Sequence, residues 1–257
     1  MPIVRIDPYS QAPLFTKMRF NSQELATGTS FFYRVKEQLF LISNWHNFSG
    51  RNANTTNPLS KSGGLPNVVS CYLCLDEQYI KREWFDFPLQ DDSTNFWYEH
   101  PELGHTVDIG ALPVELPEKY KAICINKLPS SDLRLKVSSD VFVLGYPLGL
   151  TDTHGLPVWK RASVATEPGT SLPRFLVDTA TRPGMSGSPV IHRFRGFYQH
   201  DESSSGLSGD DWIGEGDSFV GIYSGRLGAS EVEAQLGIVW KRHLIDEIAE
   251  GRKLYES

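Results

Sequence analysis

Short runs of β-branched and aromatic residues recur along the whole of this 257-residue chain, and turn-forming residues separate them. Many short strands with almost no helical periodicity predict an all-β fold, either a sandwich or barrels. An all-β protein of this length can still be a single domain, so length alone does not set the domain number. The runs are SFFYRV, QLFLIS, NVVSCYLCL, REWFDFP, NFWYE, VFVLGYP, RFLVD, SPVIH, SFVGIYS and LGIVW.

Three other segments differ from this strand pattern. Residues 241–254 place Leu244, Ile245, Ile248 and Ala249 on one apolar stripe, which predicts a terminal helix that Gly251 can end; these residues read KRHLIDEIAEGRKL. Residues 113–136 mix prolines, serines and charges, and we expect them to link two barrels. Residues 198–217 are rich in Ser, Gly and Asp, which predicts a mobile acidic surface loop.

Charge and cysteine content exclude several functions. The net charge of −6 offers no basic surface for nucleic acid, and no apolar run is long enough for a signal peptide or a membrane span, so we expect a cytoplasmic protein. Cys71, Cys74 and Cys124 are an odd number, which predicts free thiols. Cys71 and Cys74 lack a second ligand pair, and His100 and His105 lack a ligand spacing, so neither a metal nor another cofactor is expected.

The strongest local signal is TRPGMSGSPVI, where Ser186 lies between two glycines and an apolar strand follows. Gly184 and Gly187 allow a tight turn that can aim the N–H groups of Gly184 and Ser186 at one point, as in an oxyanion hole. A simple Gly/Ser-rich turn is the alternative interpretation. The motif resembles the GxSGxP signature of trypsin-like serine proteases, and the resemblance implies that Ser186 is the nucleophile.

The resemblance implies a histidine base at the end of an upstream apolar strand. LFLISNWHNFSG supplies His46 in that setting, and ATGTSFFYRVKEQ before it is similar to the strand and hairpin that precede the histidine in bacterial members. HTVDIGALPV supplies Asp108 as the carboxylate that orients the imidazole, with Gly110 where the family's DxAxL pattern has alanine. The order His46, Asp108, Ser186 is that of chymotrypsin. Competing carboxylates lie in loop-like settings or without such a motif: Asp76, Asp86, Asp91 and Asp92.

The resemblance covers nearly the whole chain and implies two antiparallel six-stranded β-barrels with a C-terminal helix, as in a bacterial stand-alone peptidase domain. Residues 1–118 would hold the N-terminal segment and the first barrel, with His46 and Asp108. Residues 119–136 would link the barrels, and residues 137–257 would hold the second barrel, Ser186 and the helix. The implied activity is that of a serine endopeptidase whose partner is a protein or peptide substrate.

The same resemblance implies a substrate cleft along SFVGIYSGRLG. Ser224 would face the triad carboxylate, and the backbone through Gly225 and Arg226 would pair with substrate. Ala180 would form the floor of the pocket for the residue before the cut and Gly237 an open wall, which predicts cleavage after small or medium apolar residues. Whether Arg226 points into this pocket or to the surface stays open.

Met185 departs from the secreted trypsins, because it cannot form the ion pair that an aspartate makes there after zymogen cleavage. Regulation by a protein partner therefore stays open. An α/β-hydrolase with Ser186, Asp211 or Asp217, and His243 is disfavoured, since GMSGS lacks the final glycine of GxSxG. The stronger alternative is an inactive protein of the same fold that binds a partner peptide in the cleft.

Overall fold

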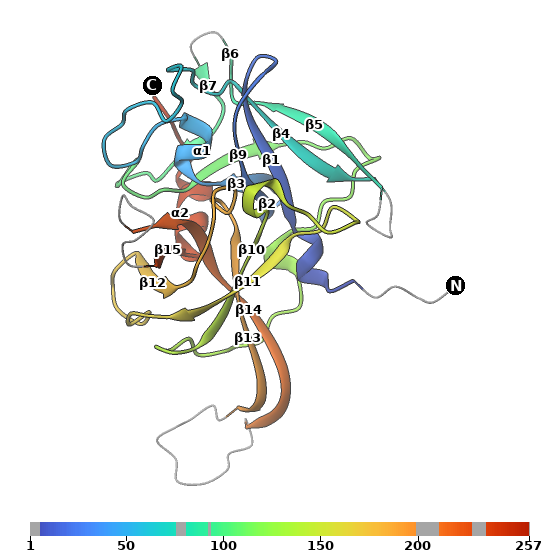
Figure 1. Ribbon diagram of the computed structural model, residues 1–257, viewed down its shortest axis with the longest axis vertical. Coiled ribbons are helices and arrows are strands. Elements are labelled where there is room, and N and C mark those ends of the chain that lie inside the picture. Colours follow the sequence, from blue (N-terminus) through green and yellow to red (C-terminus); the bar gives the residue numbers. More distant parts are fainter. Residues whose placement is uncertain (1–5, 76–80, 92–93, 199–210, 228–234, 257) are drawn as a thin grey trace.

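The computed structural model describes residues 6–75, 81–91, 94–198, 211–227 and 235–256, which form two β structures packed on each other (Figure 1). The first is a sheet of eight strands in the order β16-β8-β9-β3-β2-β1-β4-β5. It has two strands more than the six expected, partly because the C-terminal β16 pairs with β8. The strands are β1 (Pro13–Phe20), β2 (Gln23–Val35), β3 (Gln38–Ser43), β4 (Val68–Cys74), β5 (Arg82–Pro88), β8 (Tyr98–Glu99), β9 (Gly110–Val114) and β16 (Lys253–Leu254); β6 (Gln90–Asp91) and β7 (Thr94–Asn95) pair separately.

The second structure is a closed antiparallel barrel in the order β10-β11-β12-β15-β14-β13, which confirms the six strands predicted for it. Its strands are β10 (Asp140–Gly145), β11 (Val158–Val164), β12 (Arg174–Asp178), β13 (Pro189–Tyr198), β14 (Trp212–Arg226) and β15 (Leu236–Lys241). Valines and aromatic residues from these strands fill its interior. The all-β fold class predicted from the sequence is therefore confirmed.

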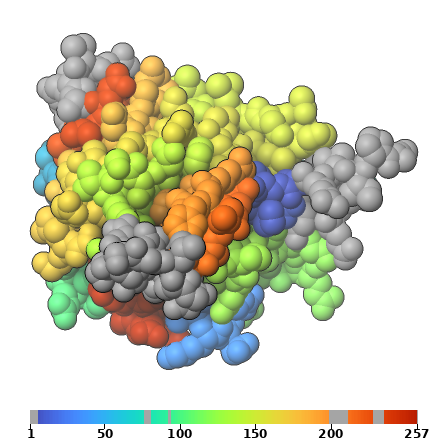
Figure 2. Space-filling model, turned by 90° about the horizontal axis from the view of Figure 1, so that it is seen from below, coloured from blue at the N-terminus to red at the C-terminus, as the bar shows by residue number. Residues whose placement is uncertain are grey.

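β13 and β14 form a long hairpin that stands out from the second barrel (Figure 1), and Figure 2 views the face that carries it. The register continues to the pair Tyr198 and Trp212. The predicted acidic loop over 198–217 is thus replaced at both ends by paired strand, because aromatic rings of the two strands stack across the hairpin. Residues 199–210 at its centre lie outside the described residues.

The C-terminal helix α2 (His243–Gly251) packs where the two β structures meet. Its four predicted apolar residues are buried in a cluster that also holds Phe31 of the first sheet and Phe219 of the second barrel. The helix ends at Gly251, but the left-handed cap is the next residue, Arg252, with φ 49°, and not the glycine. Gly251 instead allows Pro101 to approach, since a Cβ there would lie 2.8 Å from the proline ring.

The predicted linker contains one short 3-10 helix, η2 (Ile125–Lys127), and Asn126 exchanges side-chain to backbone hydrogen bonds with Arg34 of β2. Near the other end of the chain, Asp7 precedes η1 (Pro8–Gln11) and pairs with Arg193 of β13 at 2.7 Å. The domain boundaries at 118 and 136 stay predictions. Within the described ranges, no helix has the length and apolar character needed to cross a membrane.

The three cysteines are free thiols and are buried in the first β structure and its linker. Burial raises the pKa of the Cys71 thiol to about 12, so this residue is unreactive as a nucleophile near neutral pH. No group of three or more potential metal ligands occurs among the residues that the structure describes.

We expect His192 to make the protein less stable in acid. Burial lowers the pKa of this imidazole, an effect that Asp140 and Asp217 partly oppose. The unfolded chain then binds more protons as the pH falls through the ordinary histidine range, so the contribution to stability is full above about pH 6.5 and is lost below it. The free energy of unfolding should therefore fall less between about pH 7.5 and about pH 5.5 in His192→Gln than in the parent. Denaturant titrations of both proteins at each pH test this. An equal fall in the free energy of unfolding in the two proteins would exclude His192 as a source of the acid sensitivity.

Candidate active site

His46 and Asp108 form a close pair in the first β structure. The short helix α1 (Trp45–Ser49) follows β3 directly and carries His46. The backbone N–H of His46 donates to Asp108 Oδ1 at 2.9 Å, and Nδ1 lies 2.7 Å from Oδ2. The Asp108 side chain is 7% exposed and that of His46 is 18% exposed. A buried carboxylate at Nδ1 favours the proton on that nitrogen, so Nε2 is left as a free base.

Packing around α1 explains the glycine that replaces alanine in the aspartate motif. A Cβ on Gly110 would lie 2.6 Å from the Phe48 ring. Val107 and Ile109 on either side of Asp108 are buried, and Asn44 Nδ2 donates to the Asp108 carbonyl at 2.7 Å. These contacts hold the carboxylate in one place beneath the imidazole.

The loop between β12 and β13 carries Ser186. The backbone at Gly184 and Gly187, on either side of this serine, has a conformation that only glycine readily adopts. Gly184 has φ +95° and Gly187 φ +85°, and added Cβ atoms would lie 2.3 Å from the Tyr146 carbonyl oxygen and 2.0 Å from the Thr29 carbonyl oxygen. Within the described residues, the N–H groups of Gly184 and Ser186 have no protein acceptor, whereas that of Gly187 donates to Tyr223. These two N–H groups are the donors predicted for an oxyanion hole, and that role stays a prediction.

Two residues of the first β structure, neither of them predicted to have a role, hold this loop. The Thr29 N–H donates to the Ser186 carbonyl at 2.8 Å, and Thr29 Oγ1 donates to the Gly184 carbonyl at 2.9 Å. Asn47 Nδ2 lies 3.3 Å from the same Ser186 oxygen. The signal for Thr29 was its place in ATGTSFF, the segment whose resemblance supported His46.

His46 and Ser186 line one cavity of about 220 Å³, together with Gly184. No hydrogen bond joins Ser186 Oγ to the imidazole among the described residues. In substrate-free enzymes such bonds are often long and tighten only when substrate binds. The structure therefore brings the three predicted residues to one place with the histidine–aspartate bond already formed.

A second cavity of about 280 Å³ borders the other side of His46, and Asp108, Ser224 and Arg226 line it. Ser224 thus shares a cavity with the carboxylate, and the prediction that it faces Asp108 stays a prediction. The pairing of β14 with β13 ends near Ile222 and Tyr223, so the edge at Ser224–Arg226 has no described strand on that side. A free strand edge beside a nucleophile can pair with the backbone of an extended peptide.

The pocket predicted for the residue before the cut is narrower at Gly237 than the open wall that the sequence implied. A Cβ on Gly237 would lie 2.4 Å from the Tyr223 ring, so this ring occupies the space that the glycine leaves open. Tyr223 is buried and its hydroxyl is hydrogen-bonded to Thr181. Neither cavity beside His46 includes Ala180 or Gly237. Arg226 lines the cavity beside Asp108, and Ala180 is not part of that cavity.

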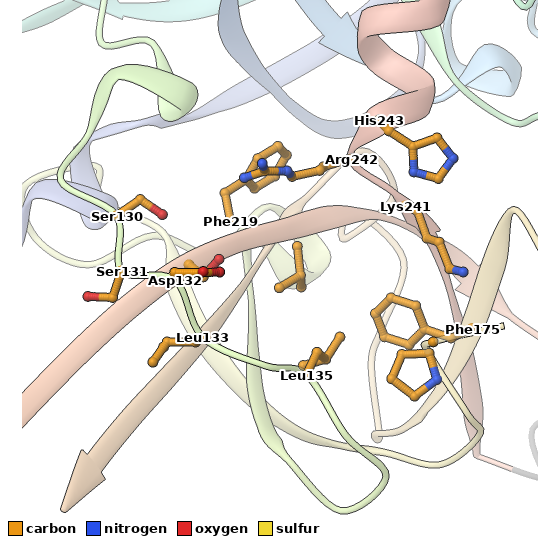
Figure 3. Close-up of a pocket in the computed structure, with 14 residues that line it drawn as sticks. Ser130, Ser131, Asp132, Leu133, Leu135, Phe175, Phe219, Lys241, Arg242 and His243 are labelled. Atoms are coloured by element: carbon orange, nitrogen blue, oxygen red, sulfur yellow. The ribbon is translucent and has the colours of Figure 1, made fainter. Parts of the chain in front are cut away.

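A cavity of about 640 Å³ lies away from His46, Asp108 and Ser186 (Figure 3). Lys241, Arg242 and His243 line one part of it, and Ser131 and Asp132 lie on a loop opposite. His243 belongs to this cavity and not to that of Ser186. The hydrolase alternative fails on this point and because Asp217 pairs with Arg193 at 2.6 Å.

Solved structures with the same architecture are serine proteases. A Ser-to-Ala mutant of Rv3671c from M. tuberculosis H37Rv, in an inactive form, matches with a TM-score of 0.50 at 15% identity, over 97% of this chain and 95% of that chain. The HtrA-type protease AlgW, solved with a tripeptide, matches with a TM-score of 0.51 at 13% identity, over 95% of this chain and 63% of that chain. This chain has the trypsin-like protease fold. No protein-family model and no curated protein sequence matches it.

Within the trypsin-like fold, the residue before Ser186 has an apolar environment here. Met185 is fully buried in the core of the second barrel, among Val190, Tyr223 and other apolar residues. Burial of an apolar side chain stabilises this loop without an ion pair. The packing agrees with the sequence argument that the aspartate-dependent activation of secreted trypsins does not apply to Met185.

Proposed function

We propose that this chain is a serine endopeptidase that hydrolyses peptide bonds through an acyl-enzyme. The observation that carries the proposal is the hydrogen-bonded His46 and Asp108 pair beside a loop whose Gly184 and Ser186 N–H groups are unpaired. This combination supplies a base with a defined tautomer and two donors for a developing oxyanion. A fold of trypsin type by itself would not carry the activity.

In the proposed mechanism, Ser186 Oγ attacks the scissile carbonyl and His46 Nε2 takes its proton. Asp108 stabilises the imidazolium, and the N–H groups of Gly184 and Ser186 stabilise the oxyanion. The imidazolium then protonates the leaving amine, and a water molecule activated by the same base hydrolyses the ester. No step requires a metal or an organic cofactor. Protein and peptide substrates are the proposed partners.

We further propose that the residue before the cut is small and uncharged. Ala180 offers no partner for a cation, and the Tyr223 ring narrows the space beside Gly237. An extended substrate would pair with the free edge of β14 at Ser224–Arg226.

A non-catalytic peptide-binding protein of the same fold is the second candidate, favoured by the missing hydrogen bond between Ser186 and His46. Covalent labelling with a fluorophosphonate separates the two. We expect one label per chain in the parent protein and none in Ser186→Ala, because only an activated serine attacks the probe. Ser131→Ala, in the distant cavity of Figure 3, is the control and should label as the parent does. An unlabelled parent would favour the binding protein, and labelling that survives Ser186→Ala would exclude Ser186 as the nucleophile.

A further inference from the structure

The cavity on the Asp108 side of His46 has a lining suited to an anion. Besides His46 and Asp108 it is bordered by Ser224 and Arg226 at the free edge of β14, and by Arg174 at the start of β12. Its volume of about 280 Å³ is enough for one or two amino-acid side chains. A side chain of a peptide paired with β14 would therefore enter it.

Two arginines give this cavity its positive charge. Neither Arg174 nor Arg226 forms an ion pair or a hydrogen bond through its side chain with any residue that the structure describes. Arg174 lies over the Trp240 ring, with its guanidinium carbon 5.4 Å from the ring centroid. Asp108 is the one acid among the described residues of the lining, and both of its oxygens already accept hydrogen bonds from His46. Most arginines elsewhere in the second barrel are paired, as Arg161 is with Asp140 at 2.6 Å.

Trp240 supplies an aromatic ring to the same cavity, beneath the Arg174 guanidinium. It lines the cavity and is only 5% exposed, and its indole N–H has no acceptor within the described protein. Because this N–H is itself buried, Trp240 contributes its ring face, which supports the Arg174 guanidinium, and not a donor.

We propose that this cavity binds a carboxylate side chain, Glu or Asp, that lies two to four residues before the cut in the substrate. The inference rests on the proposed peptidase function, because it uses the β14 edge as the substrate strand. Arg226 and Arg174 supply guanidinium groups, whose planar pairs of donors match a carboxylate. The substrate class is then a peptide with an acidic residue upstream of a small uncharged one.

Binding to the Ser186→Ala protein tests the site without cleavage. Fluorescent peptides with Glu at the second, third or fourth position before the intended cut are compared with matched Gln peptides by anisotropy. We expect at least one Glu peptide to bind about tenfold more tightly than its Gln counterpart, since charge-assisted hydrogen bonds are stronger than neutral ones. The ratio of Glu-peptide affinity to Gln-peptide affinity should fall as salt is added, because salt screens the charges.

Arginine variants locate the effect. Arg226→Gln and Arg174→Gln in the same background should each move the ratio of Glu-peptide affinity to Gln-peptide affinity towards one. Arg161→Gln removes the same charge from an exposed site that does not line this cavity, and it should leave the affinity ratio unchanged. Equal binding of Glu and Gln peptides, including no measurable binding of either, would overturn the proposal. So would a preference that survives both cavity variants.

Cleavage by the parent protein separates this proposal from the endopeptidase proposal. If the parent hydrolyses Glu and Gln peptides at the same rate and binds them equally, the proposed carboxylate site is wrong and the proposed peptidase activity is supported. If it binds a Glu peptide selectively but does not cleave it, the carboxylate site is supported and the peptidase activity is wrong.

Discussion

Ser186→Ala and His46→Ala are each expected to lower kcat on a cleaved peptide by on the order of 10⁶-fold, by analogy with measured triads. Each change removes a group that forms or breaks bonds in the proposed mechanism. Asp108→Asn should cost about 10⁴-fold, because an amide at this position favours the wrong imidazole tautomer. The 2.7 Å contact between Asp108 Oδ2 and His46 Nδ1 is the bond that this change alters. Steady-state kinetics on a peptide identified by library profiling gives the three values.

A double variant and a control variant at another carboxylate show whether the losses of activity are specific to these three residues. The double variant Ser186→Ala/His46→Ala should lose little more activity than either single variant, because the residues act as one unit. Asp86→Asn changes a competing carboxylate that pairs with Arg19 on the exposed side of β5, and it should keep full turnover. If Asp108→Asn cleaves as fast as the parent, the assignment of this carboxylate is wrong.

Gly184→Ala is expected to lower kcat by about 10²–10³-fold, the effect of losing one oxyanion donor. A Cβ at this position would lie 2.3 Å from the Tyr146 carbonyl oxygen, and φ +95° is strained for alanine. The loop must therefore move, and the Gly184 N–H moves with it. The same assay measures kcat, and thermal unfolding shows whether the variant is folded.

Gly169→Ala is the matched control for this substitution. Gly169 has no atom within 4 Å of an added Cβ and lies in the cavity that is distant from Ser186. Its alanine variant should keep the turnover of the parent. A folded Gly184→Ala protein with full turnover would contradict the assignment of the Gly184 N–H to the oxyanion hole.

Residues whose signal is local were predictable from the sequence. Val, Ile and aromatic runs indicated strands such as β3 and β4, and the stripe on α2 followed from helical periodicity. Gly184 and Gly187 adopt a backbone conformation that other residues avoid, so these glycines in the sequence indicated the turn around Ser186.

Strands with weaker local signals were missed. β1 (Pro13–Phe20) contains Lys17 and Arg19, which make ion pairs on its outer face, and β11 (Val158–Val164) contains Lys160 and Arg161. Polar residues on one face of a half-buried strand break up an apolar run, so such strands are recognised only when their partners are known. The short β16 is a strand only because β8 is beside it.

The amino-acid sequence by itself therefore determined the all-β class, the terminal helix and the candidates His46, Asp108 and Ser186, because each leaves a signal in neighbouring residues. The tertiary structure alone decided that Thr29 holds the loop that carries Ser186 and that the Tyr223 ring lies against Gly237. It also placed Arg174 and Arg226 in one cavity beside Asp108. These contacts join residues far apart in the chain, and side chains so separated meet only when strands close into a barrel and the two β structures pack together.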